Sequence, residues 1–162
     1  MPVVRFAILG ALILAASVCR AQGVVTVRTL SLPAAKLIAE TALAECAARG
    51  FDTAVAVVDR YGQLLVLLRD EQATTATIDM ARGKAYTAVI FRSSTLEFQK
   101  ATANDPVRAP QRDVPGILAL GGGVPITVGT EIVGGVASSG SNQTTDDECA
   151  RAGLAKAAEL LK

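Results

Sequence analysis

The sequence predicts an α+β domain in which helices pack on a mostly antiparallel sheet. Two observations predict this class. Short β-rich runs lie next to each other and are joined by turn residues, which is typical of antiparallel hairpins. Apolar residues recur at helical spacing between and after these runs. The chain of 162 residues shows no internal repeat and is long enough for one domain with its own core.

Residues 1–21 have the composition of a secretory signal peptide. Arg5 precedes an uncharged apolar stretch, residues 6–18, which is too short for a stable membrane anchor. Cleavage is expected after Ala21, which leaves residues 22–162 as a single periplasmic or extracellular domain. The alternatives are a cytoplasmic protein with an apolar first helix and lipidation at Cys19, although Val18 is large for the residue before a lipidated cysteine.

Charge and composition exclude several classes of function. Removal of Arg5 and Arg20 leaves 14 basic and 15 acidic residues, a net charge of −1. No basic run is present, which argues against nucleic acid as a partner. The chain has no histidine, which excludes Ser-His-Asp chemistry, His-containing zinc sites and His-ligated haem. No catalytic residue is assigned, and a non-enzymatic role is favoured.

The first half of the chain predicts a strand, a helix and a hairpin. Residues 24–30 alternate apolar and polar side chains, as a strand does. Ser31 can cap a helix that has Pro33 in its first turn and ends at Gly50. One side of this helix carries Ile38, Ala42 and Cys46. The β-rich runs 53–59 and 63–69 then form a hairpin.

Helices dominate the middle of the chain. Residues 77–91 predict a helix, and residues 94–102 a shorter one. The buried stripe of the longer helix comprises Ile78, Ala81, Ala85 and Val89. Residues 104–115 contain three prolines and many charges, which predicts an exposed loop.

Three more strands and a final helix complete the domain. Strands are expected at residues 117–120, 124–128 and 132–138, with three glycines between the first two. The final helix has one apolar face, which comprises Cys149, Ala150, Gly153, Leu154, Ala157, Leu160 and Leu161.

The order of motifs in the last third is more specific than any one motif. A Pro-Gly pair ends at Gly116, a Gly-Gly-Gly-Val-Pro-Ile turn spans 121–126, a strand from Glu131 ends in Ser-Gly, and an acidic helix start spans 146–148. This order resembles the GlcG/HbpS-like family of small haem-binding proteins. The segments 57–62 and 79–88 also look like it, so the resemblance covers roughly residues 30 to 161.

The resemblance implies a fold in which the first and last helices lie on one face of the sheet. That arrangement places Cys46 and Cys149 in the same layer. The two cysteines could form a disulfide or remain as buried free thiols, and the sequence does not decide between these alternatives. It also implies a symmetric homo-oligomer.

Haem is the cofactor that the resemblance implies, but two family features are missing. Ile117 stands where the relatives have a threonine iron ligand, and Asp79 and Arg82 stand where they have a Glu-x-x-Glu pair for free iron. Haem binding would then rest on apolar contact and propionate pairing, or on Met80, Tyr86 or a cysteine as the iron ligand.

The candidate cofactor-binding residues are Lys84, Tyr86, Gly121, Gly122, Gly123 and Pro125. The backbone amides of the glycines could bind a ligand. The favoured interpretation is that the glycines form a tight hairpin and bind nothing. Lys84 could pair with a propionate, but a solvated lysine on the outer helix face is favoured. Arg82 lies nearer the buried stripe and is expected to be partly buried, either at a partner's interface or over the sheet.

The acidic cluster 146–148 could bind a divalent cation, but interaction with the helix dipole is favoured. No metal site is assigned.

Two functional hypotheses follow. The first is a secreted, oligomeric haem- or tetrapyrrole-binding protein that serves haem uptake or sensing. The second is a protein that binds a small organic acid, or an enzyme accessory to glycolate or diol metabolism. Its pocket would include the glycine turn. Arg108 or Arg112 would bind the carboxylate of the ligand, and Asp113 would act as an acid or base. A structural oligomer subunit is a third, simpler interpretation.

Overall fold

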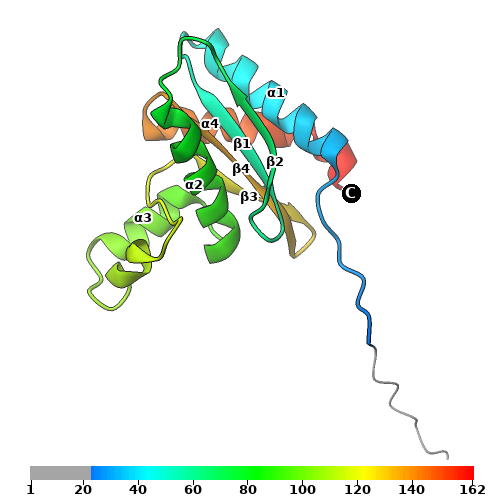
Figure 1. The fold of residues 1–162 in the computed structure, drawn as a ribbon, viewed down its shortest axis with the longest axis vertical. Coiled ribbons are helices and arrows are strands. Elements are labelled where there is room, and N and C mark those ends of the chain that lie inside the picture. Colours follow the sequence, from blue (N-terminus) through cyan, green and yellow to red (C-terminus); the bar gives the residue numbers. More distant parts are fainter. Residues whose placement is uncertain (1–22) are drawn as a thin grey trace, which may run out of the picture.

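The computed structural model describes residues 23–162, so the proposed signal peptide at 1–21 lies outside the described residues. The elements follow in the order α1 (Leu32–Ala48), β1 (Ala54–Asp59), β2 (Leu64–Arg69), α2 (Ala76–Phe91), α3 (Thr95–Ala103), η1 (Ala109–Asp113), β3 (Gly123–Val128), β4 (Glu131–Ser139), α4 (Gln143–Lys156) and η2 (Ala158–Leu161). Figure 1 shows these helices and strands along the chain.

The four strands form one antiparallel sheet in the order β2-β1-β4-β3. The two hairpins β1–β2 and β3–β4 are joined through the pairing of β1 with β4, in which Val57 lies opposite Val136. The central strands β1 and β4 are almost entirely buried, as expected for strands covered on both faces.

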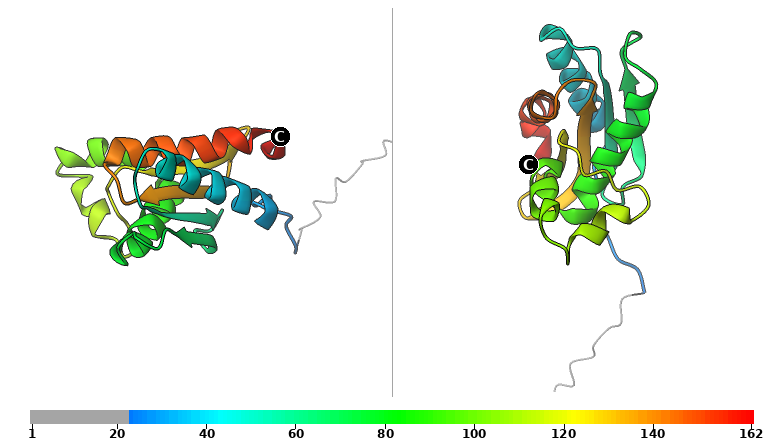
Figure 2. Two further views of the ribbon diagram at one scale, coloured as in Figure 1. Left: turned by 90° about the horizontal axis from the view of Figure 1, so that it is seen from above. Right: turned by 90° about the vertical axis from the view of Figure 1, so that its left-hand side faces the viewer.

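Helices cover both faces of this sheet. Figure 2 shows α1 and α4 side by side on one face and α2 on the other. One apolar cluster, which includes Ile38, Val57 and Ala150, fills the layer under α1 and α4. A second, which includes Val58 and Ala85, lies under α2. The predicted α+β class is therefore confirmed, including the first and last helices on one face.

Local signals explain where the helices begin and end. The Ser31 hydroxyl accepts a hydrogen bond from the Ala34 amide at 3.4 Å at the start of α1. Gly50 follows the helix with a φ of 81°, a conformation that glycine adopts at little cost. Asn142 caps α4 by accepting from two amides of the first turn. These interactions satisfy amides that have no partner within the helix.

A disulfide joins Cys46 of α1 to Cys149 of α4, with the two Cα atoms 5.6 Å apart. Both cysteines are fully buried between the helices and the sheet. The question that the sequence left open is therefore settled in favour of the bridge over two free thiols.

Two predicted strands are absent from the described residues. Residues 24–30 form no strand, because only one backbone hydrogen bond joins them to the sheet, from the Leu30 amide to the Val133 carbonyl at 3.0 Å. Residues 117–120 are also irregular, because the Leu118 amide donates to the Thr87 hydroxyl of α2 at 2.8 Å instead of to a neighbouring strand. A strand-like sequence pattern was therefore not sufficient in either segment, because a strand also needs a neighbouring strand to pair with.

Two further expectations need correction. The predicted loop 104–115 contains the short helix η1, and Arg112 is half-buried because it donates to the Thr102 hydroxyl and the Gln99 carbonyl. The last helix ends at Lys156, so Leu160 lies in η2 and is exposed, although it was expected on the buried face.

The substitution Gly153→Ala is expected to lower the free energy of unfolding by about 2 kcal/mol, although alanine is the better helix former. A Cβ at Gly153 would overlap the backbone carbonyl of Ile38, because α1 and α4 approach closely there. Urea unfolding measures the effect. The control Ala155→Ser lies on the exposed face of α4 and should change stability by less than about 0.5 kcal/mol. A Gly153→Ala variant at least as stable as the parent would contradict this packing.

Candidate functional site

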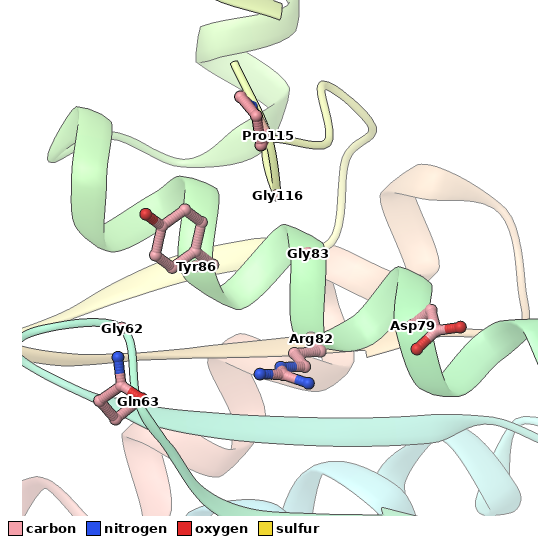
Figure 3. A pocket seen from close by; sticks show the side chains of 8 residues that line it. All are labelled: Gly62, Gln63, Asp79, Arg82, Gly83, Tyr86, Pro115 and Gly116. Atoms are coloured by element: carbon pink, nitrogen blue, oxygen red, sulfur yellow. The ribbon is translucent and has the colours of Figure 1, made fainter. Parts of the chain in front are cut away.

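A cleft of about 350 Å³ lies between α2, the turn from β1 to β2, and the loop that precedes β3. It is lined by Gly62, Gln63, Asp79, Arg82, Gly83, Tyr86, Pro115 and Gly116. Figure 3 shows these residues, with Asp79, Arg82 and Tyr86 on successive turns of α2. The volume lies at the lower end of the range for small-molecule pockets, about 300–1,000 Å³.

Tyr86 is the only aromatic residue that lines this cleft. Its half-buried ring lies between two glycines, because a Cβ at Gly62 would overlap the ring and one at Gly116 would come within 3.4 Å of it. Among residues 23–162 its hydroxyl has no hydrogen-bond partner. A phenol oxygen in this position is available to a ligand, including as an oxygen ligand to ferric iron.

The polar groups of the cleft are a cation, a carboxylate and an amide. Arg82 and Asp79 are both exposed, and within the described part of the chain neither has an ion-pair partner. Burial of Arg82 over the sheet is therefore wrong, because no other element among residues 23–162 covers its side chain. Burial at a partner's interface stays a prediction. An unpaired guanidinium in the cleft can pair with a carboxylate of a ligand.

The structure reduces the number of residues that could be the iron ligand. Cys46 and Cys149 are bonded to each other and hold no free thiolate. Met80 lies on a different side of α2, where it lines a second cavity. Ile117 follows Gly116 beside the cleft and offers no donor atom. Among the residues considered from the sequence, Tyr86 is therefore the one that combines a donor atom with a place in the cleft.

Lys84 lies away from the cleft and is only 2% exposed. Its ammonium donates to Asp146 Oδ2 at 2.8 Å and to the Ser138 carbonyl at 3.1 Å. Burial lowers the pKa of Lys84, and the Asp146 carboxylate partly opposes this effect. The prediction of a solvated lysine on the outer face is therefore wrong, because the start of α4 covers that side of α2.

The glycine turn is packed and bonded inside the protein. The Gly121 amide donates to the Gln143 side chain at 2.7 Å, and the Gly123 amide to the Thr95 hydroxyl at 2.8 Å. Gly122 has a φ of 121°, and a Cβ there would lie 3.0 Å from Lys84 Nζ. The turn thus makes room for the buried lysine. It is not the tight hairpin that was favoured, because residues 117–120 form no strand to pair with β3.

Pro125 lies further along β3, where it lines a shallow cavity with residues of α4 and η2. Tyr86 is thus the one candidate residue in the cleft, and the structure does not gather the six candidates into one pocket.

The acidic start of α4 forms ion pairs. Asp147 pairs with Arg151, and Glu148 pairs with Arg49, the residue that follows α1. Between residues 23 and 162, no group of three or more His, Cys, Asp or Glu side chains is placed to hold a metal ion. No helix in this same range has the length and apolar character needed to cross a membrane.

Sequence reasoning missed the residues that form the walls of the cleft. Gln63, Gly83 and Pro115 come from three separate segments and become neighbours only in the fold. The available signal was the pair of segments 57–62 and 79–88, which carried the family resemblance and contribute five of the cleft residues. Their spacing gave no indication that they face each other.

The fold and the site define a small α+β protein with an open cleft along one helix. The family model described as "Haem degrading protein HbpS-like" matches residues 30–155. The chain belongs to this HbpS-like family, as the sequence resemblance indicated.

Individual relatives agree with this assignment. HbpS of Streptomyces reticuli, solved as a mutant with two Glu-to-Asp exchanges, is 34% identical with a TM-score of 0.79, over 93% of this chain and 97% of that one. An uncharacterised 15.0 kDa protein from the dhaT-dhaS intergenic region of Citrobacter freundii is 29% identical over 140 residues, 83% of this chain and 96% of the relative. The PduOC–haem complex, at 22% identity and a TM-score of 0.72 over 79% of this chain and 94% of that one, shows the shared fold.

Proposed function

We propose that this chain is a secreted haem-binding protein of the HbpS-like family and that haem lies in the Tyr86 cleft. The observation that carries the proposal is the Tyr86 ring, which lies between two glycines and lines the same cleft as Arg82. Neither the Tyr86 hydroxyl nor the Arg82 guanidinium has a partner within residues 23–162. Family membership supports haem as the ligand, as does the haem complex of PduOC, which has the same fold.

The residues of the cleft fit a haem in three respects. Glycine walls allow a flat ring to approach the backbone closely. Arg82 can pair with a propionate, while the Asp79 carboxylate repels one and so favours a single orientation. Tyr86 can supply an oxygen ligand to the iron. Because the cleft holds only about 350 Å³, part of the macrocycle would extend over the surface of this chain.

Export is part of the proposal. The apolar leader at residues 1–21 supports it, and the Cys46–Cys149 bridge is of the kind that persists outside a reducing cytoplasm. A homo-oligomer is also proposed, and light scattering of residues 22–162 tests it: a monomeric peak would contradict the assembly.

The organic-acid hypothesis receives less support. Arg112, one of its two carboxylate-binding candidates, is engaged with Thr102 and Gln99. Two of the three glycine amides on which it relied are bonded to protein side chains. The groups that this hypothesis needed therefore already have partners in the fold.

Hemin titrated into residues 22–162 is expected to give a saturable, shifted Soret band. Tyr86→Phe keeps the ring but removes the proposed iron ligand, so it should change the position of the band and weaken binding about tenfold, which is ~1.4 kcal/mol. Tyr61→Phe is the matched control, because Tyr61 is 59% exposed and does not line the cleft.

A spectrum identical to that of free hemin at micromolar concentrations would refute the proposed function. An unchanged spectrum and affinity in Tyr86→Phe would leave haem binding in place but exclude Tyr86 as the iron ligand.

A further inference from the structure

A second cavity of about 300 Å³ lies on another side of α2 and shares no lining residue with the Tyr86 cleft. It lies where α2 meets the start of α4, two elements that Figure 1 places at the same end of the sheet. Thr77, Met80 and Lys84 line it from α2, and Ser141 and Asp146 from the other side. The haem proposal makes no use of this cavity.

The buried ion pair of Lys84 and Asp146 forms part of the cavity wall. Both side chains are only 2% exposed. The two acceptors of Lys84, on Asp146 and Ser138, leave one of its three N–H groups without a partner among the described residues. Asp146 Oδ1 accepts from both the amide and the hydroxyl of Ser141, at 3.1 and 2.7 Å. The carboxylate is therefore held in a fixed position next to the amine.

This geometry combines an amine, an adjacent carboxylate and a cavity that both groups line. A lysine that is desolvated in a pocket is a better nucleophile toward carbonyl groups, because more of it is in the neutral form at a given pH. Burial is the dominant influence on the pKa of Lys84 and lowers it. Asp146, at 2.8 Å, can accept the proton that the ammonium must lose before it reacts.

We propose that Lys84 captures small aldehydes as imines, with Asp146 as the proton carrier. In the first step Lys84 transfers a proton to Asp146, and the nitrogen lone pair forms a bond to the carbonyl carbon. A proton then moves from nitrogen to the former carbonyl oxygen, which gives a carbinolamine. Asp146 returns its proton to this hydroxyl, the C–O bond breaks, and water leaves with the formation of a protonated imine.

The overall change is ammonium plus aldehyde to iminium plus water, and it needs no oxidant or reductant. The cavity selects the size and polarity of the aldehyde. Its volume suits a compound of a few carbon atoms, and hydroxyl groups from Thr77, Ser139 and Ser141 among the lining residues suit a hydroxyaldehyde.

Reductive trapping tests the proposal on the wild-type chain of residues 22–162. The protein is incubated near neutral pH with glycolaldehyde and cyanoborohydride, and labelling at each of the five lysines is followed by peptide mass spectrometry. Lys84 is expected to be labelled about tenfold faster than the exposed Lys36 and Lys100, because burial lowers the pKa of Lys84 and leaves more of its amine in the neutral form. Labelling of Lys84 no faster than of those two lysines overturns the proposal.

A pair of variants shows whether the aldehyde enters through the cavity. Thr74 is exposed and lines it, so Thr74→Phe should obstruct its mouth and slow labelling of Lys84 severalfold. Thr75→Phe is the matched control, because Thr75 is also exposed but does not line the cavity. Equal labelling of Lys84 in the two variants overturns the proposal, and labelling of the exposed lysines should be the same in both.

Discussion

Asp146→Asn is expected to lower the free energy of unfolding by about 3–5 kcal/mol, because it leaves a buried ammonium without its counter-charge. Lys84 Nζ lies 2.8 Å from the carboxylate, and both side chains are almost fully inaccessible to solvent. The loss would appear as a lower midpoint in urea unfolding with an unchanged slope.

Two further variants separate the ion pair from other roles of Asp146. Glu148→Gln removes a half-exposed carboxylate from the same turn of α4 and should cost at most about 1 kcal/mol. The double variant Lys84→Met, Asp146→Leu removes both buried charges and should be more stable than Asp146→Asn. If the double variant is no more stable than the single one, the cost does not come from the unpaired charge.

The pH dependence of the Asp146→Asn variant has a defined sign. Burial holds the pKa of Lys84 below its ordinary value of 10.5, so the unfolded chain binds more protons than the folded one between these two values. Stability therefore rises with pH across this window. Without Asp146 the pKa of Lys84 falls further, so the variant should regain more stability than the parent as the pH rises toward 10.5.

Reduction of the Cys46–Cys149 bridge is expected to cost about 4–5 kcal/mol, because the bond closes a loop with a sequence separation of 103 residues. The open chain gains conformational entropy when it unfolds, and α1 and α4 are then held together only by non-covalent contacts, which include the exposed Arg49–Glu148 ion pair. Urea midpoints with and without dithiothreitol measure the effect.

The double variant Cys46→Ala, Cys149→Ala serves as the control, because it cannot form the bond and should not respond to dithiothreitol. An oxidised parent that unfolds at the same urea concentration as the reduced one would show that the bridge does not stabilise this fold.

Some elements were predictable from the sequence because their signals are local. The Ser31 cap, the glycine at position 50 and the turn between the two β-rich runs each act over a few residues. The two absent strands show the limit of such signals. Residues 24–30 alternate in polarity, and residues 117–120 are apolar, but a strand also needs a neighbour with free backbone groups.

The candidate site was predictable only in part. Tyr86 was identified through the family resemblance and does line the cleft, whereas Lys84 was placed on the solvated face of its helix. Its burial depends on Asp146, which is 62 residues away in the sequence. No helical periodicity within α2 could indicate that the start of α4 covers that face.

The α+β class, the exclusion of histidine chemistry and the family could all be inferred from the sequence, because they follow from composition, local propensity and the order of motifs. The Cys46–Cys149 bond, the buried ion pair of Lys84 and the open cleft beside Tyr86 became known only from the fold. Each of these features depends on contacts between segments far apart in the chain, whose positions are set by the packing of helices on both faces of one sheet.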